Sequence, residues 1–164
     1  MVPDVQRWLD FAENDLAVAK HLLETFHPKP LEIICYHCQQ AAEKAIKAVY
    51  IALGIPGGIP KKHDLTFLLE QMKHRVDIPD AMFDHADDLN SYSIIVRYPN
   101  EIQIDERKVL LSIRYADEMT VWAKEAISVH GMTEQGSAQP KTDEAVSLTT
   151  TPKHASKRNP MYKL

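Results

Sequence analysis

Apolar residues recur at steps of three and four along most of this chain, and this spacing is the feature that most constrains its fold. No stretch alternates apolar and polar residues for long, and the 164 residues include only five glycines. The pattern predicts helices over about 3–25, 31–53, 63–75, 80–96 and 106–130. Long helices with short connections predict an all-α fold, an up-and-down antiparallel bundle of four long helices plus a short extra helix.

Residues that favour helix ends separate these segments. Gly54 suits a C-terminal cap, and Pro56 prevents the second helix from continuing. Asp64 and Asp105 are predicted N-caps, because their carboxylates can accept hydrogen bonds from backbone N–H groups of the first turn. Gly131 is predicted to close the last helix. The stripe predicted for the first helix is Trp8, Phe11, Ala12, Leu16, Ala19, Leu22, Leu23 and Phe26.

The composition changes after Gly131. Residues 132–164 are rich in Thr, Ser, Pro, Lys and Gln and show no helical stripe. We therefore predict one helical domain over residues 1–131 and a disordered tail over residues 132–164.

Charge and hydropathy argue against several classes of protein. The net charge is −4, and residues 1–130 carry 14 Lys and Arg against 20 Asp and Glu, which argues against a general nucleic-acid binder. The chain lacks a run of 18 apolar residues and a basic start followed by an apolar stretch, so we expect no membrane helix and no signal peptide. These features and two cysteines spaced i,i+3 predict a cytoplasmic protein with reduced thiols.

The segment "CYHCQQAAEKAIKA" (35–48) holds both cysteines. On a helical wheel, Cys35 and Cys38 fall on the apolar arc among alanines, while His37 points away from them. A zinc site needs four ligands at set spacing, and a single cysteine pair does not supply them. We therefore predict that both cysteines are core residues and that the chain has no metal site.

The opposite arc of the same helix is polar. Gln40, Glu43, Lys44 and Lys47 form one compact patch, in which Glu43 and Lys47 are an i,i+4 pair in the favourable order. Two interpretations stay open. The patch is either a solvated face with an exposed ion pair, or a functional site if it is desolvated. The acidic "DHADD" (84–88) is predicted to be a solvated helix face rather than a hard-metal site.

Three segments in this order, "YHCQQAAEKAIKA", "HDLTFLLEQM" and "YSIIVRYP", resemble the HEPN family (higher eukaryotes and prokaryotes nucleotide-binding domains). The resemblance covers about residues 5–130 and is to the branch with a QQAxEKxxKA helix, an HDL and a later RYP. It implies a bundle like that of nucleotidyltransferase substrate-binding subunits, and a homodimer. It also implies a minimal nucleotidyltransferase as protein partner, in a toxin–antitoxin-like or regulatory pair.

Catalytic members of this family are metal-independent ribonucleases whose signature is an arginine, four to six residues, then a histidine. None of the six arginines here has a histidine five to seven positions later. The resemblance therefore implies a non-catalytic nucleotide-binding or regulatory partner that needs no cofactor. A ribonuclease toxin centred on Arg97, and a dimerising scaffold without a ligand, are the alternatives.

The candidate site residues come from the polar patch and from the two later motifs. Arg97 can offer a fork of donors to a phosphate, and Tyr98 can stack on a base, although Arg97 tied internally to Glu43 or Asp64 is an equal alternative. The predicted nucleotide- or partner-binding set is Gln40, Glu43, Lys44, Lys47, His63, Asp64, Arg97 and Tyr98.

Overall fold

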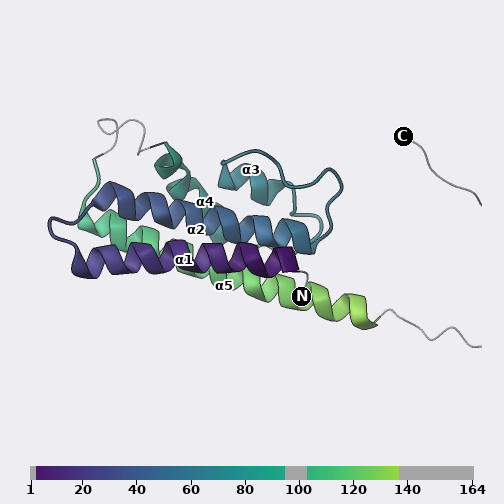
Figure 1. The fold of residues 1–164 in the computed structure, drawn as a ribbon. Helices are drawn as coiled ribbons and strands as arrows, with labels where there is room; N and C mark the ends of the chain where they lie inside the picture. Colours follow the sequence, from purple (N-terminus) through teal and green to yellow (C-terminus); the bar gives the residue numbers. More distant parts are fainter. Residues whose placement is uncertain (1–2, 95–102, 137–164) are drawn as a thin grey trace, which may run out of the picture.

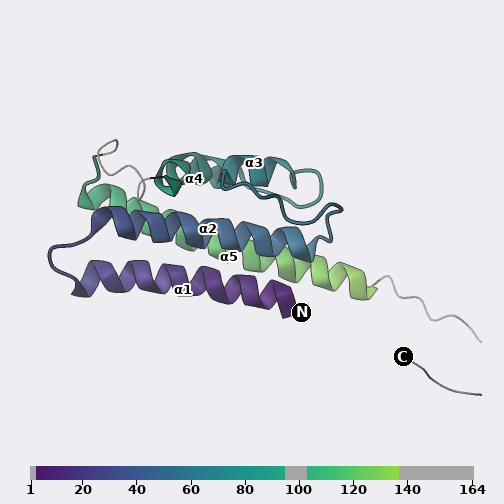
Figure 2. The same cartoon turned by 45° about the horizontal axis from the view of Figure 1, so that its top comes forward.

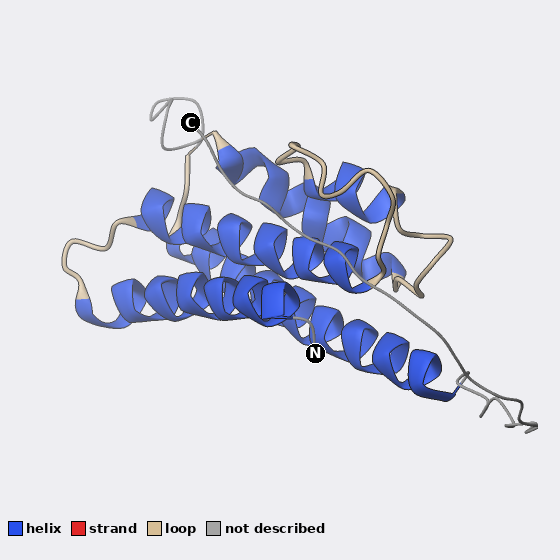
Figure 3. Cartoon of the chain, turned by 45° about the vertical axis from the view of Figure 1, so that its right-hand side comes forward, coloured by secondary structure: helices blue, strands red, loops and turns tan. Residues whose placement is uncertain are grey.

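The computed structural model describes residues 3–94 and 103–136, with side chains placed over 4–94 and 103–131, and this part of the chain is built from helices (Figures 1 and 3). The elements are α1 (Pro3–Thr25), α2 (Leu31–Ala52), α3 (Leu65–Glu70), α4 (Asp80–Asn90), the 3-10 helix η1 (Ser91–Ser93) and α5 (Glu106–Gly136). Helices α1, α2, α4 and α5 run alternately in opposite directions, and the short α3 lies beside α4, with its first residue, Leu65, next to the last residue of α4, Asn90 (Figure 1). The predicted all-α up-and-down bundle is confirmed.

Helix ends follow the local chemistry read from the sequence. The Asp64 carboxylate accepts a hydrogen bond from the Phe67 N–H at 2.9 Å, and the Asp105 carboxylate accepts one from the Lys108 N–H at 2.8 Å. Gly54 follows α2 with a φ of 56°, a left-handed conformation that glycine adopts at little cost. Both predicted N-caps and the glycine cap are therefore confirmed.

Three predicted helix ends are wrong. The third helix is predicted to reach about residue 75, but α3 ends at Glu70 and turns follow it. The fourth helix is predicted to reach residue 96, but α4 ends at Asn90, where the Ser91 and Ser93 hydroxyls bond to the backbone oxygens of Asp88 and Asn90. Such side-chain hydrogen bonds to the backbone compete with those of the α-helix, and the chain continues as the tighter 3-10 helix η1. Gly131 does not close α5, which continues to Gly136, since a glycine inside a helix costs only about 1 kcal/mol relative to alanine.

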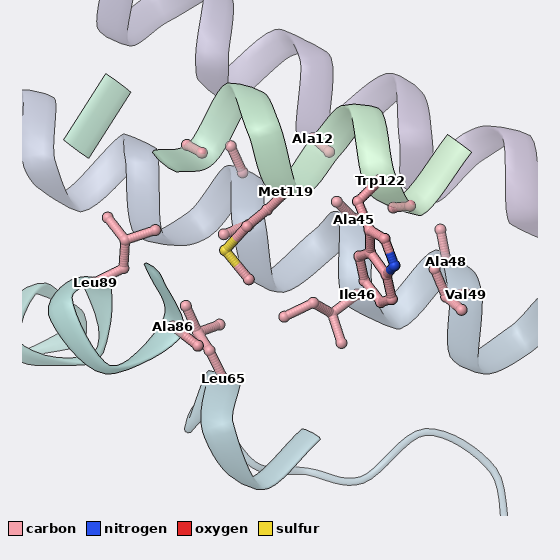
Figure 4. Packing of buried hydrophobic residues seen from close by; sticks show 14 of the residues in the cluster. Ala12, Ala45, Ile46, Ala48, Val49, Leu65, Ala86, Leu89, Met119 and Trp122 are labelled. Carbon is pink, nitrogen blue, oxygen red and sulfur yellow. The ribbon is translucent and has the colours of Figure 1, made fainter. Parts of the chain in front are cut away.

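Helix α2 lies at the centre of the bundle. It packs against α1, α5, and α3 with α4 (Figure 2). Side chains around nearly its whole circumference are therefore buried. Four of its alanines and both cysteines are fully buried: Cys35, Cys38, Ala41, Ala42, Ala45 and Ala48. These small residues let neighbouring helices approach closely, while Ile46 contributes to the core near Met119 and Leu65 (Figure 4). The prediction of core cysteines is confirmed.

The predicted stripe of α1 is only partly buried. Ala12, Leu16 and Ala19 lie in the core, but Phe11 and Phe26 are 46% and 55% exposed. Adjacent positions on a helix point about 100° apart, so Phe11 lies off the face that Ala12 presents to the core. The apolar arc of α1 is therefore wider than the surface that its own bundle covers.

The acidic segment 84–88 is also only partly as predicted. Asp84, Asp87 and Asp88 are exposed, but His85 is buried because this side of α4 packs on α5. Its ring stacks on Tyr115 with 4.2 Å between ring centroids, and its Nε2 lies 2.7 Å from a Glu118 carboxylate oxygen. No helix within the described ranges is both long and apolar enough to cross a bilayer.

The two core cysteines generate a testable prediction. Burial raises the pKa of the Cys35 thiol from its ordinary value of 9.0 to about 11, and burial beside Cys35 also raises the pKa of Cys38. Because the thiolate is the reactive form, both thiols should resist a disulfide reagent at pH 8 until the protein is unfolded. A Leu110→Cys variant, whose position is exposed, should react at once as the control.

The same shift sets a pH dependence of stability. The folded state keeps the Cys35 proton where the unfolded chain has lost it, so the free energy of unfolding should fall as pH rises from 9.0 to about 11. Chemical denaturation across this range measures the effect. Rapid labelling of both native thiols in the folded protein at pH 8 would contradict their burial.

Candidate functional site

Four polar side chains meet on one side of α2, beside the loop that leads into α3. We name them the Glu43 cluster: Gln39, Glu43, Lys47 and His63. One Glu43 carboxylate oxygen, Oε1, accepts a hydrogen bond from Lys47 Nζ at 2.6 Å and lies 3.0 Å from His63 Nδ1. The other, Oε2, accepts from Gln39 Nε2 at 3.1 Å. The carboxylate thus has three donor groups within the chain.

The cluster is buried on its inner side and open on its outer side. The side chains of Glu43 and Lys47 are 6% and 9% exposed, whereas that of His63 is 68% exposed. The interpretation of the patch as a solvated ion pair is therefore wrong for Glu43 and Lys47. The helical wheel is right to put both on the polar arc, but the loop before α3 and the first helix close over that arc.

Two contacts hold this cover in place. Gln39 Nε2 also donates to the backbone oxygen of His63 at 3.2 Å, which fixes the loop against α2. On the other side, the Trp8 ring of α1 lies 5.7 Å from Lys47 Nζ, close enough for a cation–π interaction. A buried ion pair is stable only when its remaining hydrogen-bonding groups are satisfied. Here Gln39 and His63 supply the further hydrogen-bond donors to the Glu43 carboxylate.

The arrangement fixes the orientation of the His63 imidazole. An ionised carboxylate only accepts hydrogen bonds, so His63 Nδ1 carries the proton that points at Glu43. The other ring nitrogen, Nε2, makes no hydrogen bond to the described residues and belongs to an exposed ring. A carboxylate that holds one imidazole nitrogen and leaves the other toward solvent is the arrangement that hydrolytic triads use to orient a histidine.

The structure places the other predicted site residues in different surroundings. Lys44 Nζ pairs with the Asp15 carboxylate of α1, whose Oδ1 lies 3.0 Å from His37 Nδ1. We name Asp15, His37 and Lys44 the Asp15 cluster; it ties α1 to α2 beside the Glu43 cluster. Gln40 Nε2 donates to Gln39 Oε1 at 2.8 Å and so reaches the Glu43 cluster indirectly.

Asp64 serves the local structure of α3. Besides capping that helix, its Oδ1 accepts from Asn90 Nδ2 at 3.2 Å, and Asn90 Oδ1 accepts from the Leu65 N–H at 2.7 Å. Arg97 and Tyr98 lie outside the described residues, so their role in the site stays a prediction. Within the described ranges, no three His, Cys, Asp or Glu side chains are grouped so that they could hold a metal ion.

Sequence reasoning missed three contributors: Trp8, Asp15 and Gln39. Gln39 stands one turn before Glu43, and this i,i+4 spacing was a usable signal. Trp8 and Asp15 belong to another helix, and pairing them with α2 requires the register of α1 against α2, which the pattern of one helix does not contain.

The buried ion pair gives a stability prediction. Glu43→Leu leaves Lys47 charged without its carboxylate, and it should lower the free energy of unfolding by about 3–5 kcal/mol, measured by urea denaturation. Glu43→Leu with Lys47→Leu should recover much of that loss. The exposed pair of Lys73 and Glu70 is the matched control, and Glu70→Leu should change stability by less than about 1 kcal/mol. Equal effects at both pairs would contradict the burial of the Glu43 cluster.

Comparisons with known proteins agree with this architecture. The HEPN domain family matches residues 5–126. A protein of Methanocaldococcus jannaschii named "Putative toxin MJ1304" is 35% identical over 95 residues, which are 54% of this chain and 59% of that protein. The match therefore spans less than two thirds of the length of that relative.

Two crystal structures have the same fold. TT1696 of Thermus thermophilus superposes with a TM-score of 0.62 at 24% identity, over 74% of this chain and 97% of that one. ST0689, an archaeal HEPN homologue, superposes with a TM-score of 0.58 at 26% identity, over 75% and 97% of the two chains. With the family match extending over most of its length, the chain belongs to the HEPN domain family.

Proposed function

We propose that this chain is the HEPN half of a toxin–antitoxin-like pair, a non-catalytic nucleotide-binding or regulatory partner of a minimal nucleotidyltransferase. The observation that carries the proposal is the Glu43 cluster, a buried ion pair beneath an exposed histidine. Glu and Lys side chains are seldom buried unless they are paired, and here the buried pair lies directly beneath an exposed histidine. The toxin name of the M. jannaschii relative supports the pairing.

The cluster offers suitable groups for a nucleotide. His63 can donate from Nε2 to a phosphate when it is protonated, and the partly exposed Lys44 adds a positive charge nearby. Trp8 is a partly buried aromatic ring beside Lys47, on which a base can stack. Because Lys47 is committed to Glu43, we assign it a supporting role and His63 the direct contact.

The first test separates nucleotide binding from general stabilisation. ATP or GTP at 100 times its dissociation constant should stabilise the wild-type protein by about 2.7 kcal/mol in thermal unfolding. His63→Gln should remove most of this shift. His74→Gln is the matched control, because His74 is also exposed but lies in the turn after α3, away from the cluster. If no nucleotide stabilises the protein in thermal unfolding, the nucleotide-binding part of the proposal is wrong and only the partner-binding part stands.

The partner is tested by co-expression of this chain with a minimal nucleotidyltransferase. The proposal expects a stable complex in size-exclusion chromatography. Two independently eluting proteins, together with no nucleotide shift, would overturn it.

A second candidate is a metal-independent ribonuclease, and the Glu43–His63 pair is the observation that favours it. His63 Nε2 would accept the proton of a ribose 2′-hydroxyl while the 2′ oxygen attacks the adjacent phosphorus and the 5′ oxygen leaves. The leaving oxygen would take a proton from the resulting imidazolium or from water. Glu43 would hold the imidazole through Nδ1 and stabilise its positive charge.

The ribonuclease candidate predicts cleavage of single-stranded RNA in the presence of EDTA. His63→Gln should lower the rate by about 100-fold or more, since general acid–base catalysis contributes that much. Arg97→Ala should also lower it, and His74→Gln should not. Unchanged cleavage by the His63 and Arg97 variants would mean that the activity comes from a contaminant.

A further inference from the structure

A cavity of about 430 Å³ opens at the end of the bundle where α2 stops and α5 continues past it (Figure 1). Its walls come from three parts of the chain: the end of α2, the loop between α3 and α4, and the second half of α5. No residue of the Glu43 cluster or of the Asp15 cluster lines it. The cavity is therefore separate from both clusters.

Apolar side chains form much of the cavity wall. Leu53 and Trp122 are each 7% exposed and Ala126 is 9% exposed, and Val76 and Pro79 add apolar surface from the loop. We name this space the Trp122 cavity. Sites for small organic molecules usually measure about 300–1,000 Å³ and combine apolar walls with a few polar groups, so its size and lining suit such a ligand.

Hydrogen bonds hold the loop that forms one wall. Trp122 Nε1 donates to the backbone oxygen of Asp77 at 3.1 Å and so ties the loop to α5. The backbone N–H groups of Arg75 and Val76 both donate to the backbone oxygen of Met72, at 2.8 and 3.2 Å. The wall is thus formed before a ligand binds, which lowers the entropic cost of binding.

Three charged side chains that line the cavity have no partner among the described residues. Arg75 and Asp77 belong to the loop and Glu125 to α5, all three are exposed, and their side chains make no hydrogen bond or ion pair within the described ranges. His130 also lines the cavity, but it makes an interaction of its own. Charges of both signs therefore stand beside one apolar wall without neutralising each other.

A second cavity, between α1 and α5, has the opposite character. It measures about 250 Å³, and the four charged side chains that line it are paired across the two helices, Lys20 with Asp117 and Lys124 with Glu13. A ligand there would have to displace these ion pairs. The Trp122 cavity instead offers charges that a ligand can pair with directly.

The signs of these charges select the class of ligand. A ligand with only a negative charge would meet the carboxylates of Asp77 and Glu125, and one with only a positive charge would meet the Arg75 guanidinium. A molecule that carries both charges can pair with each, because a guanidinium binds a carboxylate with two parallel hydrogen bonds and a carboxylate accepts from an ammonium group.

We propose that the Trp122 cavity binds a small zwitterion with an apolar body, of the class of the apolar α-amino acids. Arg75 takes the carboxylate, Asp77 and Glu125 take the ammonium group, and the apolar side chain lies on the wall that includes Trp122. The proposal does not rest on the proposed function, because the cavity shares no residue with the Glu43 cluster.

Binding is tested with L-phenylalanine, titrated into the full chain and followed by the indole N–H signals in proton–nitrogen NMR. The Trp122 signal should shift and saturate with a dissociation constant of about 1 mM or tighter, because this N–H holds the loop wall. The Trp8 signal should stay in place, since Trp8 lies beside Lys47 and does not line the cavity. An unchanged Trp122 signal, or equal shifts of both signals, would overturn the proposal.

Analogues of L-phenylalanine test the two charges. Phenylalanine amide lacks the carboxylate and 3-phenylpropionate lacks the ammonium group, and each should bind about 10-fold or more weakly because a charge-assisted interaction is lost. N-acetylphenylalanine amide carries neither charge and resembles a residue within a peptide, so it should bind weakest. Tighter binding of that compound than of L-phenylalanine would assign the cavity to a peptide segment and overturn the proposal.

Substitutions assign each charge to its residue. Arg75→Gln should weaken L-phenylalanine about 10-fold or more but leave phenylalanine amide unchanged, since the amide has no carboxylate to lose. Asp77→Asn with Glu125→Gln should weaken L-phenylalanine but not 3-phenylpropionate. Lys73→Gln and Glu70→Gln are the matched controls, because both positions are exposed and precede the loop without lining the cavity. Controls that weaken binding as much, or an Arg75→Gln protein that binds L-phenylalanine like the wild type, would overturn the proposal.

Discussion

The burial of α2 on nearly every side is the constraint on which the rest of the structure depends. The other helices of the bundle can pack closely around α2 only if its side chains are small. The alanines and cysteines of α2 meet that requirement. The same enclosure acts on its charged residues. Glu43 and Lys47 are desolvated because the helix that carries them is central, and the surrounding chain must supply donors to the carboxylate.

That requirement connects the core to the candidate site. Gln39 and His63 satisfy Glu43, and Gln39 also fixes the loop that delivers His63. One network therefore stabilises the bundle, positions the loop and leaves an oriented imidazole at the surface. This HEPN chain lacks the arginine–histidine spacing of the ribonuclease signature, and within its described residues this network joins a buried ion pair to an exposed histidine.

Much of the fold could be predicted because a helical bundle repeats a local pattern, and residues such as Asp64 and Gly54 mark its ends through bonds within a few residues. The wrong predictions concern contacts between one helix and the elements packed around it. A helical wheel gives the direction of Glu43 and of Phe11 on their own helices, but not how many elements cover each direction. Glu43 is covered by a loop and by α1, whereas Phe11 is left open. The end of α4 depends on serine hydroxyls competing for backbone oxygens.

The central claim is that buried Glu43 holds His63 through Nδ1 and leaves Nε2 toward solvent. Long-range proton–nitrogen NMR of the imidazoles tests it directly, at a pH high enough to leave the rings neutral. The account predicts that His63 is found with its proton on Nδ1, whereas the exposed His74 averages between both forms. A His63 spectrum that matches that of His74 would mean that the ring is not held by Glu43, and the candidate site would lose its basis.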